Sequence, residues 1–183
     1  MANKVMYGLK NVHYAVETEA QDGTISYGTP VPWKGAVSIS LDPEGETSTF
    51  YADNVAYYVA LANNGYSGDF ESAMVPASFL TDVMGEETTQ SGIRLEKSDA
   101  NPKYFALLFE FEGDANAVRY ALYHCKMART NIESGTKEEG VEVQTVTGEI
   151  TATPRPNDSI VKGVCDTTTA TAYDNWYESV QIA

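Results

Sequence analysis

The sequence predicts a mostly-β fold, and two observations carry this prediction. Residues 104–126 have the pattern of an antiparallel hairpin, two aromatic strands joined by a polar connection over 112–117. Val, Thr and Tyr, which favour strands, are common, and 14 Gly and 7 Pro interrupt the 183 residues every few positions. Because strand side chains alternate between faces, the hairpin's first strand lines one face with Phe105, Leu107, Phe109 and Phe111. The hairpin places no side chain for catalysis, so we expect a scaffold that acts through its surfaces.

The first 73 residues predict five short strands separated by turn-forming residues. A polar loop is expected over 19–32, and Asp42-Pro43-Glu44-Gly45 ends the second strand as a turn. A break at 52–55 separates the third strand from the fourth, and Asn63-Asn64-Gly65 predicts a tight hairpin turn before the fifth. The five strands are expected at residues 5–17, 36–41, 47–51, 56–62 and 66–73.

One short helix is predicted over about residues 76–84. Pro76 suits a first helical turn, where its missing N–H costs little, and Gly85 supplies a left-handed stop. Apolar side chains recur at helical spacing and form one stripe of Phe79, Leu80, Val83 and Met84. A helix of this length is not stable alone, so we expect it to pack on a sheet.

The remaining segments complete a single domain, residues 1–183. We expect a polar loop over 86–92, a charged connection over 128–140, and a single extended strand over 141–153 that ends at Pro154-Arg155-Pro156. No apolar stretch reaches the roughly 20 residues of a membrane helix, and the N-terminus lacks the apolar core of a signal peptide. The expectation is therefore a protein made in the cytoplasm that contacts no membrane.

The charge of the chain is strongly and unevenly negative. The net charge is −14, and the Lys and Arg residues are too dispersed for a basic patch that would bind nucleic acid by neutralising phosphates. Such an excess most often only solubilises a surface, and a sharper interpretation is a surface that repels a polyanion. Between Gly35 and Ile93 there is no Lys, Arg or His, and the acids there are Asp42, Glu44, Glu46, Asp53, Asp69, Glu71, Asp82, Glu86 and Glu87.

The sequence assembles no catalytic, cofactor or metal site. The two histidines, His13 and His124, lack the neighbouring nucleophile and acid of a hydrolase, and no nucleotide-binding glycine pattern occurs. Glu110 and Glu112 share a strand face as a glycosidase pair does, but acids are common at strand ends, so this interpretation has little weight. Two cysteines far apart in the sequence make no disulfide framework and no zinc site. We expect a protein that is not an enzyme and binds no cofactor or metal.

Several tyrosines and tryptophans are candidates for an interface, because these side chains bury a large area and keep a polar tip. A half-buried β face explains them equally well. They are Tyr51, Tyr57, Tyr58, Tyr66, Trp176 and Tyr177.

An ordered set of segments resembles the phi13-type major tail protein family of long, non-contractile-tailed bacteriophages. The resemblance spans nearly the whole chain and is least distinctive after about Asp166. The segments are Tyr7–Tyr14, Gly35–Val37, Phe50–Asn54, Asn64–Gly68, Pro76–Gly85, Phe105–Asp114, Arg119–Cys125 and Pro154–Pro156.

The resemblance implies a two-sheet β-sandwich or barrel-like tail tube fold with one short flanking helix and extended loops. It implies a structural virion protein of a siphovirus, assembled in the host bacterial cytoplasm into stacked, hexameric rings. The resulting tube would house the tape measure protein and deliver DNA without binding it specifically. The other implied partners are tail terminator and baseplate or distal tail proteins.

Two sets of residues become candidate sites on this interpretation. The long loops 42–58 and 128–140 are candidates for contacts between rings, and Glu110 and Glu112 are candidate acids facing the lumen. Two alternatives stay open: a tube protein of a related bacterial injection system, and a non-enzymatic β-sandwich binding module of a phage fibre or baseplate. The inter-subunit candidates are Asp42, Glu44, Glu46, Phe50, Tyr51, Asp53, Asn54, Tyr57 and Tyr58.

Overall fold

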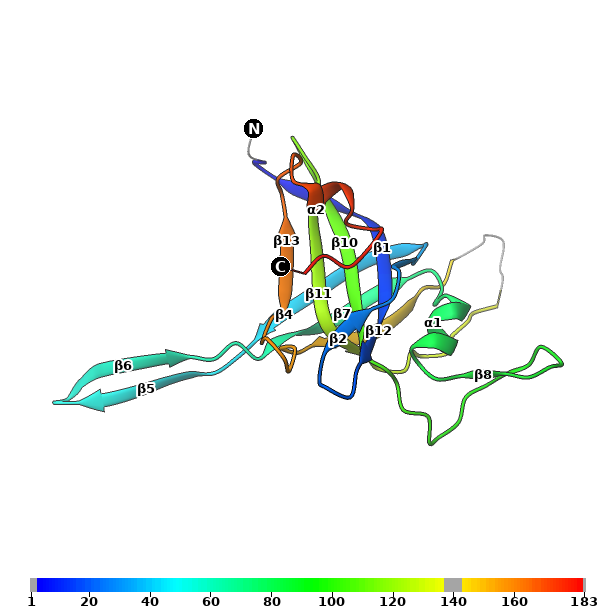
Figure 1. The fold of residues 1–183 in the computed structure, drawn as a ribbon, viewed down its shortest axis with the longest axis horizontal. Coiled ribbons are helices and arrows are strands. Elements are labelled where there is room, and N and C mark those ends of the chain that lie inside the picture. The colour runs from blue at the N-terminus through cyan, green and yellow to red at the C-terminus, as the bar shows by residue number, and fades with distance from the viewer. Residues whose placement is uncertain (1–2, 137–142, 183) are drawn as a thin grey trace.

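The computed structural model describes residues 3–136 and 143–182 and has the mostly-β fold that the sequence predicts (Figure 1). Nine strands of this part of the chain form one antiparallel sheet in the order β2-β1-β10-β11-β12-β7-β4, with β3 paired to β1 and β13 paired to β11. The strands are β1 (Met6–Glu19), β2 (Ile25–Tyr27), β3 (Val31–Pro32), β4 (Ala36–Glu44), β7 (Gly65–Ser72), β10 (Phe105–Gly113), β11 (Val118–Met127), β12 (Val146–Ala152) and β13 (Lys162–Cys165).

The sheet bends into two layers at β11. Residues 119–122 of this strand pair with β13, whereas residues 125–127 pair with β12. His124 lies between the two stretches with a backbone φ of 52°, and a left-handed residue of this kind redirects a strand. In Figure 1, β10, β11 and β13 stand upright while β4, β7 and β12 cross them. The two-layer, barrel-like arrangement agrees with the predicted fold class.

The main core lies between these layers. Phe105, Leu107 and Phe109 are buried on one face of β10, as their parity predicts, and Phe111 packs against the same cluster while partly exposed. The helix α1 (Ala77–Asp82) contributes Phe79, whose ring meets that of Phe105 edge-on at 5.1 Å. The predicted helix is therefore confirmed, and Gly85 ends it with a φ of 80°.

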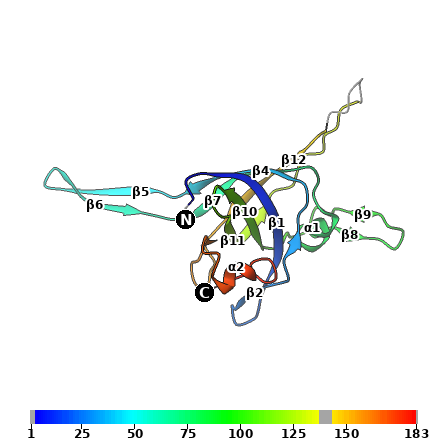
Figure 2. The ribbon, with the colours of Figure 1, turned by 90° about the horizontal axis from the view of Figure 1, so that it is seen from above.

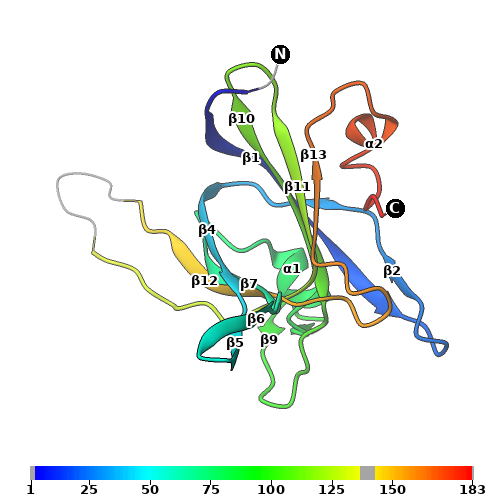
Figure 3. The same ribbon diagram turned by 90° about the vertical axis from the view of Figure 1, so that its left-hand side faces the viewer.

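A second core covers the opposite face of β10 and β11, which the sequence does not predict. Ala106, Leu108 and Tyr123 are buried there beneath Trp176 of the C-terminal segment. This segment contains a second short helix, α2 (Thr171–Asp174), beside β13 and β11 (Figure 3). The expectation of a single helix is therefore wrong, because a four-residue helix held by tertiary contacts has no periodic signal of its own.

Several predicted loops contain strands. β2 and β3 lie within the expected loop 19–32, and β8 (Glu87–Thr88) and β9 (Arg94–Leu95) form a small hairpin around the expected loop 86–92. Each has only two or three residues and exists because a partner strand pairs with it. The sequence does not predict β13 either, because this four-residue strand also depends on its pairing with β11.

The predicted strand over 141–153 is β12, which begins at Val146. Residues 128–136 have no regular structure, as expected for a connection. The parts of these two predictions that fall on 137–142 lie outside the described residues. In the part of the chain that is described, no helix is long and apolar enough to cross a membrane.

Candidate functional site

A two-stranded ribbon of β5 (Thr47–Ala52) and β6 (Val55–Leu61) projects from one end of the body (Figures 1 and 2). Its turn is Asp53-Asn54, with φ values of 52° and 59°. Two consecutive residues with positive φ make the turn type that matches the twist of paired strands, and Asp and Asn tolerate that conformation well. The expected break at 52–55 is therefore the tip of a hairpin.

The ribbon continues the ladder of β4 and β7, which corrects two predictions. β4 runs through Asp42-Pro43 to Glu44, and an edge strand tolerates a proline because it has only one partner. The Asn64 amide donates to the Glu44 carbonyl at 2.8 Å, so residues 63–65 run opposite β4 and are not a hairpin turn. Gly65 is required there because a Cβ would meet the Ala152 carbonyl oxygen at 1.9 Å.

The ribbon exposes large apolar side chains on both of its faces. Phe50 and Tyr58 are cross-strand partners and share one face, while Val59 and Leu61 point to the other. A hairpin without a covered face is marginally stable in water, and burying each large apolar side chain is worth about 1.5–3 kcal/mol. The ribbon therefore has the properties of a surface that a partner covers. The exposed fractions lie between 50% and 80% for Phe50, Tyr51, Val55, Tyr57, Tyr58, Val59 and Leu61.

The charge and hydrogen-bonding capacity of the ribbon restrict what it binds. Asp53 is the one charged residue between Thr47 and Leu61, and acids at 42, 44 and 46 lie at its base. In the described structure β5 and β6 pair only with each other, so each has an outer edge with free backbone groups. Such an edge accepts another β-strand, whereas an acidic surface repels nucleic acid.

The nine residues predicted as inter-subunit contacts all lie on this ribbon or its base, and all are exposed. The other candidate aromatics behave differently. Tyr66 is partly buried and its hydroxyl accepts a hydrogen bond from the Lys162 ammonium at 2.8 Å, while Trp176 and Tyr177 belong to the second core. In the isolated chain Tyr66 and Tyr177 are therefore half-buried and Trp176 is buried.

The two acids proposed to face a lumen have different environments. Glu110 is 6% exposed, and its carboxylate accepts hydrogen bonds from Arg119 at 3.1 Å, Tyr177 at 3.1 Å and Asn11 at 2.7 Å. Burial and this carboxylate raise the pKa of Tyr177, which keeps the phenol protonated as a donor. Glu110 is therefore buried and paired and presents no free charge at the surface. A buried carboxylate needs a compensating cation, and the Arg119 guanidinium supplies it.

Glu112 remains a candidate lumen acid. Its side chain is 35% exposed, lies near the turn of the β10–β11 hairpin and forms an ion pair with Lys10 of the neighbouring strand β1. Its position relative to a lumen stays a prediction.

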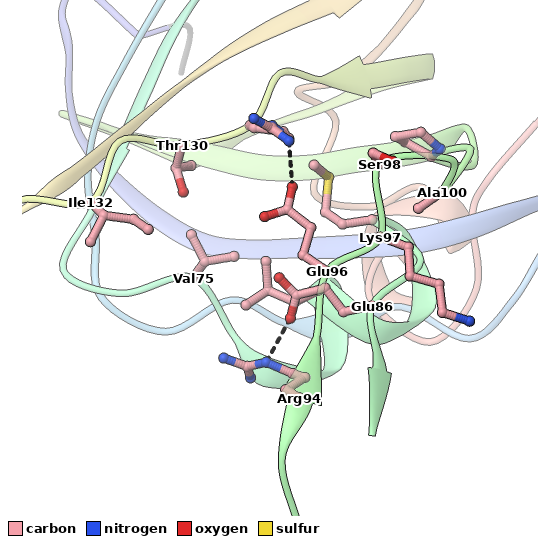
Figure 4. Close-up of a pocket in the computed structure, with 13 residues that line it drawn as sticks. Val75, Glu86, Arg94, Glu96, Lys97, Ser98, Ala100, Thr130 and Ile132 are labelled. Carbon is pink, nitrogen blue, oxygen red and sulfur yellow. Dashed lines mark hydrogen bonds and ion pairs between the residues drawn. The ribbon is translucent and has the colours of Figure 1, made fainter. Parts of the chain in front are cut away.

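A hollow of about 430 Å³ lies beside α1 (Figure 4). Two ion pairs cross its rim, Arg94 with Glu86 at 2.6 Å and Arg129 with Glu96 at 2.8 Å. Its lining comes from three separate segments, so no local pattern in the sequence marks it, although 129–132 falls in the predicted contact segment 128–140. Its apolar walls are Val75, Leu80, Met84, Ala100, Pro102 and Ile132.

The described residues contain no cluster of three or more His, Cys, Asp or Glu side chains suited to a metal ion. The described residues form an exposed apolar ribbon, a hollow with charged rims and two packed cores. The ribbon and the hollow are surfaces with the chemistry of protein contacts.

Comparison with known proteins shows a fold shared with a solved structure and no matching family. No protein-family model matches this chain, and no curated protein matches it either. A solved structure described as the anti-feeding prophage cap, a tube terminating cap, aligns over 91% of this chain and 95% of that one with a TM-score of 0.50 and 9% sequence identity. At that identity the likeness shows a shared fold, and the phi13-type resemblance stays a prediction.

Proposed function

We propose that this protein is a structural subunit of a phage tail or a phage-tail-like tube, without catalytic activity. The observation that carries the proposal is the β5–β6 ribbon, which exposes apolar side chains on both of its faces. The fold that presents this ribbon is shared with a tube terminating cap. A subunit that polymerises needs such a surface, because association must bury apolar area that the isolated chain leaves in water.

The finer proposal is a major tail tube protein that forms stacked hexameric rings in a virion. The ordered resemblance to the phi13-type family supports it, and so does the net charge of −14. An acidic subunit gives a passage to which DNA does not adhere. The tape measure protein inside, and terminator and baseplate proteins at the tube ends, are the partners this role requires.

A second candidate is a cap or tube protein of an injection system, which the solved neighbour favours because it is itself a tube terminating cap. The two candidates differ in assembly. A tube subunit stacks without limit, whereas a terminating cap forms one closed ring and stops.

Negative-stain microscopy of the purified protein, over a range of concentrations, tests the proposal. We expect rings with a central hole that stack into tubes as the concentration rises. Single rings that never stack would favour the cap. A protein that stays monomeric at every concentration tested would overturn a self-assembling role.

A further inference from the structure

The ribbon and the hollow lie at opposite ends of the molecule. Two perpendicular views place β5 and β6 at one end of the longest axis and α1 with the β8–β9 hairpin at the other (Figures 1 and 2). A contact between two different surfaces of identical chains is heterologous, and it generates a closed ring or an open stack. If these two surfaces bind each other, every copy uses both of them.

The hollow suits an aromatic, acidic occupant. Leu80, Met84 and Ile132 give it apolar walls, and Ile132 is fully exposed. A methionine adapts its shape to aromatic rings, and an arginine guanidinium stacks on a tyrosine ring while it pairs with a carboxylate. Arg129 is 73% exposed, and its ion pair with Glu96 is a surface pair of small energetic value, so its guanidinium is free to exchange partners.

The ribbon tip has the complementary chemistry. Tyr51 and Tyr57 are 67% and 72% exposed, and Asp53, the one charged residue between Thr47 and Leu61, carries the tip's negative charge. The volume of the hollow falls in the range of pockets that enclose a bound group, about 300–1,000 Å³. A hollow of this size has room for aromatic side chains.

The apolar groove between β4 and the β10–β11 hairpin fits the tip less well. It is smaller, about 250 Å³, and Lys162 is the one cation in its lining. That ammonium already donates to the Tyr66 hydroxyl at 2.8 Å and lies over the same ring. The hollow beside α1 has three cations in its lining, Arg94, Lys97 and Arg129, against two acids, Glu86 and Glu96. Each of these cations is also paired with a carboxylate, so Asp53 would replace Glu96 as the partner of the exposed Arg129.

We infer that the tip of the β5–β6 ribbon, around Asp53, inserts into the hollow beside α1 of a second copy of this chain. Tyr51 and Tyr57 lie against the apolar wall, and Asp53 pairs with Arg129. The inference rests on the proposed self-assembly and specifies which two surfaces carry it.

Disulfide trapping between two variants, each with one added cysteine, tests this pairing. Val55→Cys marks the tip and Ile132→Cys marks the hollow, and both positions are exposed. The native Cys125 and Cys165 are buried, so they do not compete. A disulfide needs Cα atoms about 4.4–6.8 Å apart, and the two ends of one chain do not meet this condition. The variants carry tags of different length, so a mixed dimer is recognised by its mass.

We expect the assembled mixture to give the mixed dimer on oxidation, and adding Arg129→Glu to the Ile132→Cys chain to remove most of it. Ser26→Cys on β2, mixed with Val55→Cys, is the matched control and should give only background. If microscopy shows rings or tubes but the Val55–Ile132 dimer does not exceed that background, the pairing is wrong and the proposed function stands. If no assemblies form, the proposed function fails first.

Discussion

Arg155 is a cation held almost completely inside the protein. Its side chain is 2% exposed, and its Nε donates to the Asp158 carboxylate at 3.0 Å while a second guanidinium nitrogen binds the other carboxylate oxygen. The Asp158 carboxylate also accepts from the Ile160 amide at 3.1 Å, so it organises the loop between β12 and β13. Among the described residues Asp158 is the one ion-pair partner of Arg155, and a buried charge becomes costly when its ion-pair partner is removed.

Asp158→Asn should destabilise the fold by about 3 kcal/mol, the lower end of the range for breaking a buried pair, because the Asp158 side of this pair is partly solvated. Urea unfolding followed by fluorescence measures the change. Asp99→Asn, at an exposed position of the 94–103 segment, is the control and should stay within about 0.5 kcal/mol of the parent. If both variants lose the same free energy of unfolding, the Arg155–Asp158 pair stabilises the fold no more than an exposed residue does.

The same pair should make stability depend on acid pH. The Arg155 guanidinium holds the pKa of Asp158 below its usual range, and the Ile160 amide adds to the effect. The pKa of Asp158 is lower in the folded chain than in the unfolded chain, where it is about 4, so near this pH the unfolded chain binds more protons. The stabilisation by the Arg155–Asp158 pair is therefore complete above about pH 4. It is lost as the pH falls through the folded pKa of Asp158. Urea midpoints of the parent should therefore decrease more steeply below about pH 4 than those of Asp158→Asn. Parallel curves would contradict this linkage.

The ribbon shows how one element can matter little for the fold and strongly for assembly. Tyr57 is 72% exposed, so Tyr57→Ser should change the free energy of unfolding of the monomer by no more than about 0.5 kcal/mol. We expect the same change to abolish or strongly weaken ring and tube formation in sedimentation velocity. Tyr7→Ser is the matched control, because Tyr7 is 55% exposed and lies on β1. If the two variants assemble equally, the ribbon is not part of the interface.

Elements with a dense local pattern could be predicted from the sequence, and elements held by distant partners could not. The alternation of Phe105 to Phe111 and the stripe around Phe79 each specify a buried face within a few residues. β13 instead depends on β11, about forty residues upstream, and α2 on the second core that Trp176 closes. Neither has a periodic signal long enough to recognise.

The candidate site divides in the same way. The Asp53-Asn54 turn and the aromatic residues around it mark the ribbon locally, so its residues could be named in advance. The continuity of the ribbon with β4 and β7 could not be predicted from the sequence, because Pro43 and Asn63-Asn64-Gly65 have the composition of turns. The burial of Glu110 depends on Arg119 and Tyr177, which a single strand's pattern does not reveal.

For the whole molecule, the decisive quantity is a net charge of −14 on a chain of 183 residues that is proposed to assemble with itself. Copies brought together repel one another, and salt weakens that repulsion because the screening length falls from about 10 Å at 0.1 M to about 3 Å at 1 M. The apolar contacts of the ribbon are not weakened by screening, whereas the proposed pair between Asp53 and Arg129 is one partly exposed interaction worth about 1 kcal/mol or less. Repulsion between whole chains should therefore dominate, so the protein concentration at which rings and tubes appear should fall as sodium chloride rises from 0.05 to 0.5 M.

Light scattering across a concentration series measures this threshold, and the Tyr57→Ser variant should not assemble at any of these salt concentrations. If salt dissolves the assemblies of the parent instead, attraction between charged groups holds the subunits together and the apolar ribbon does not.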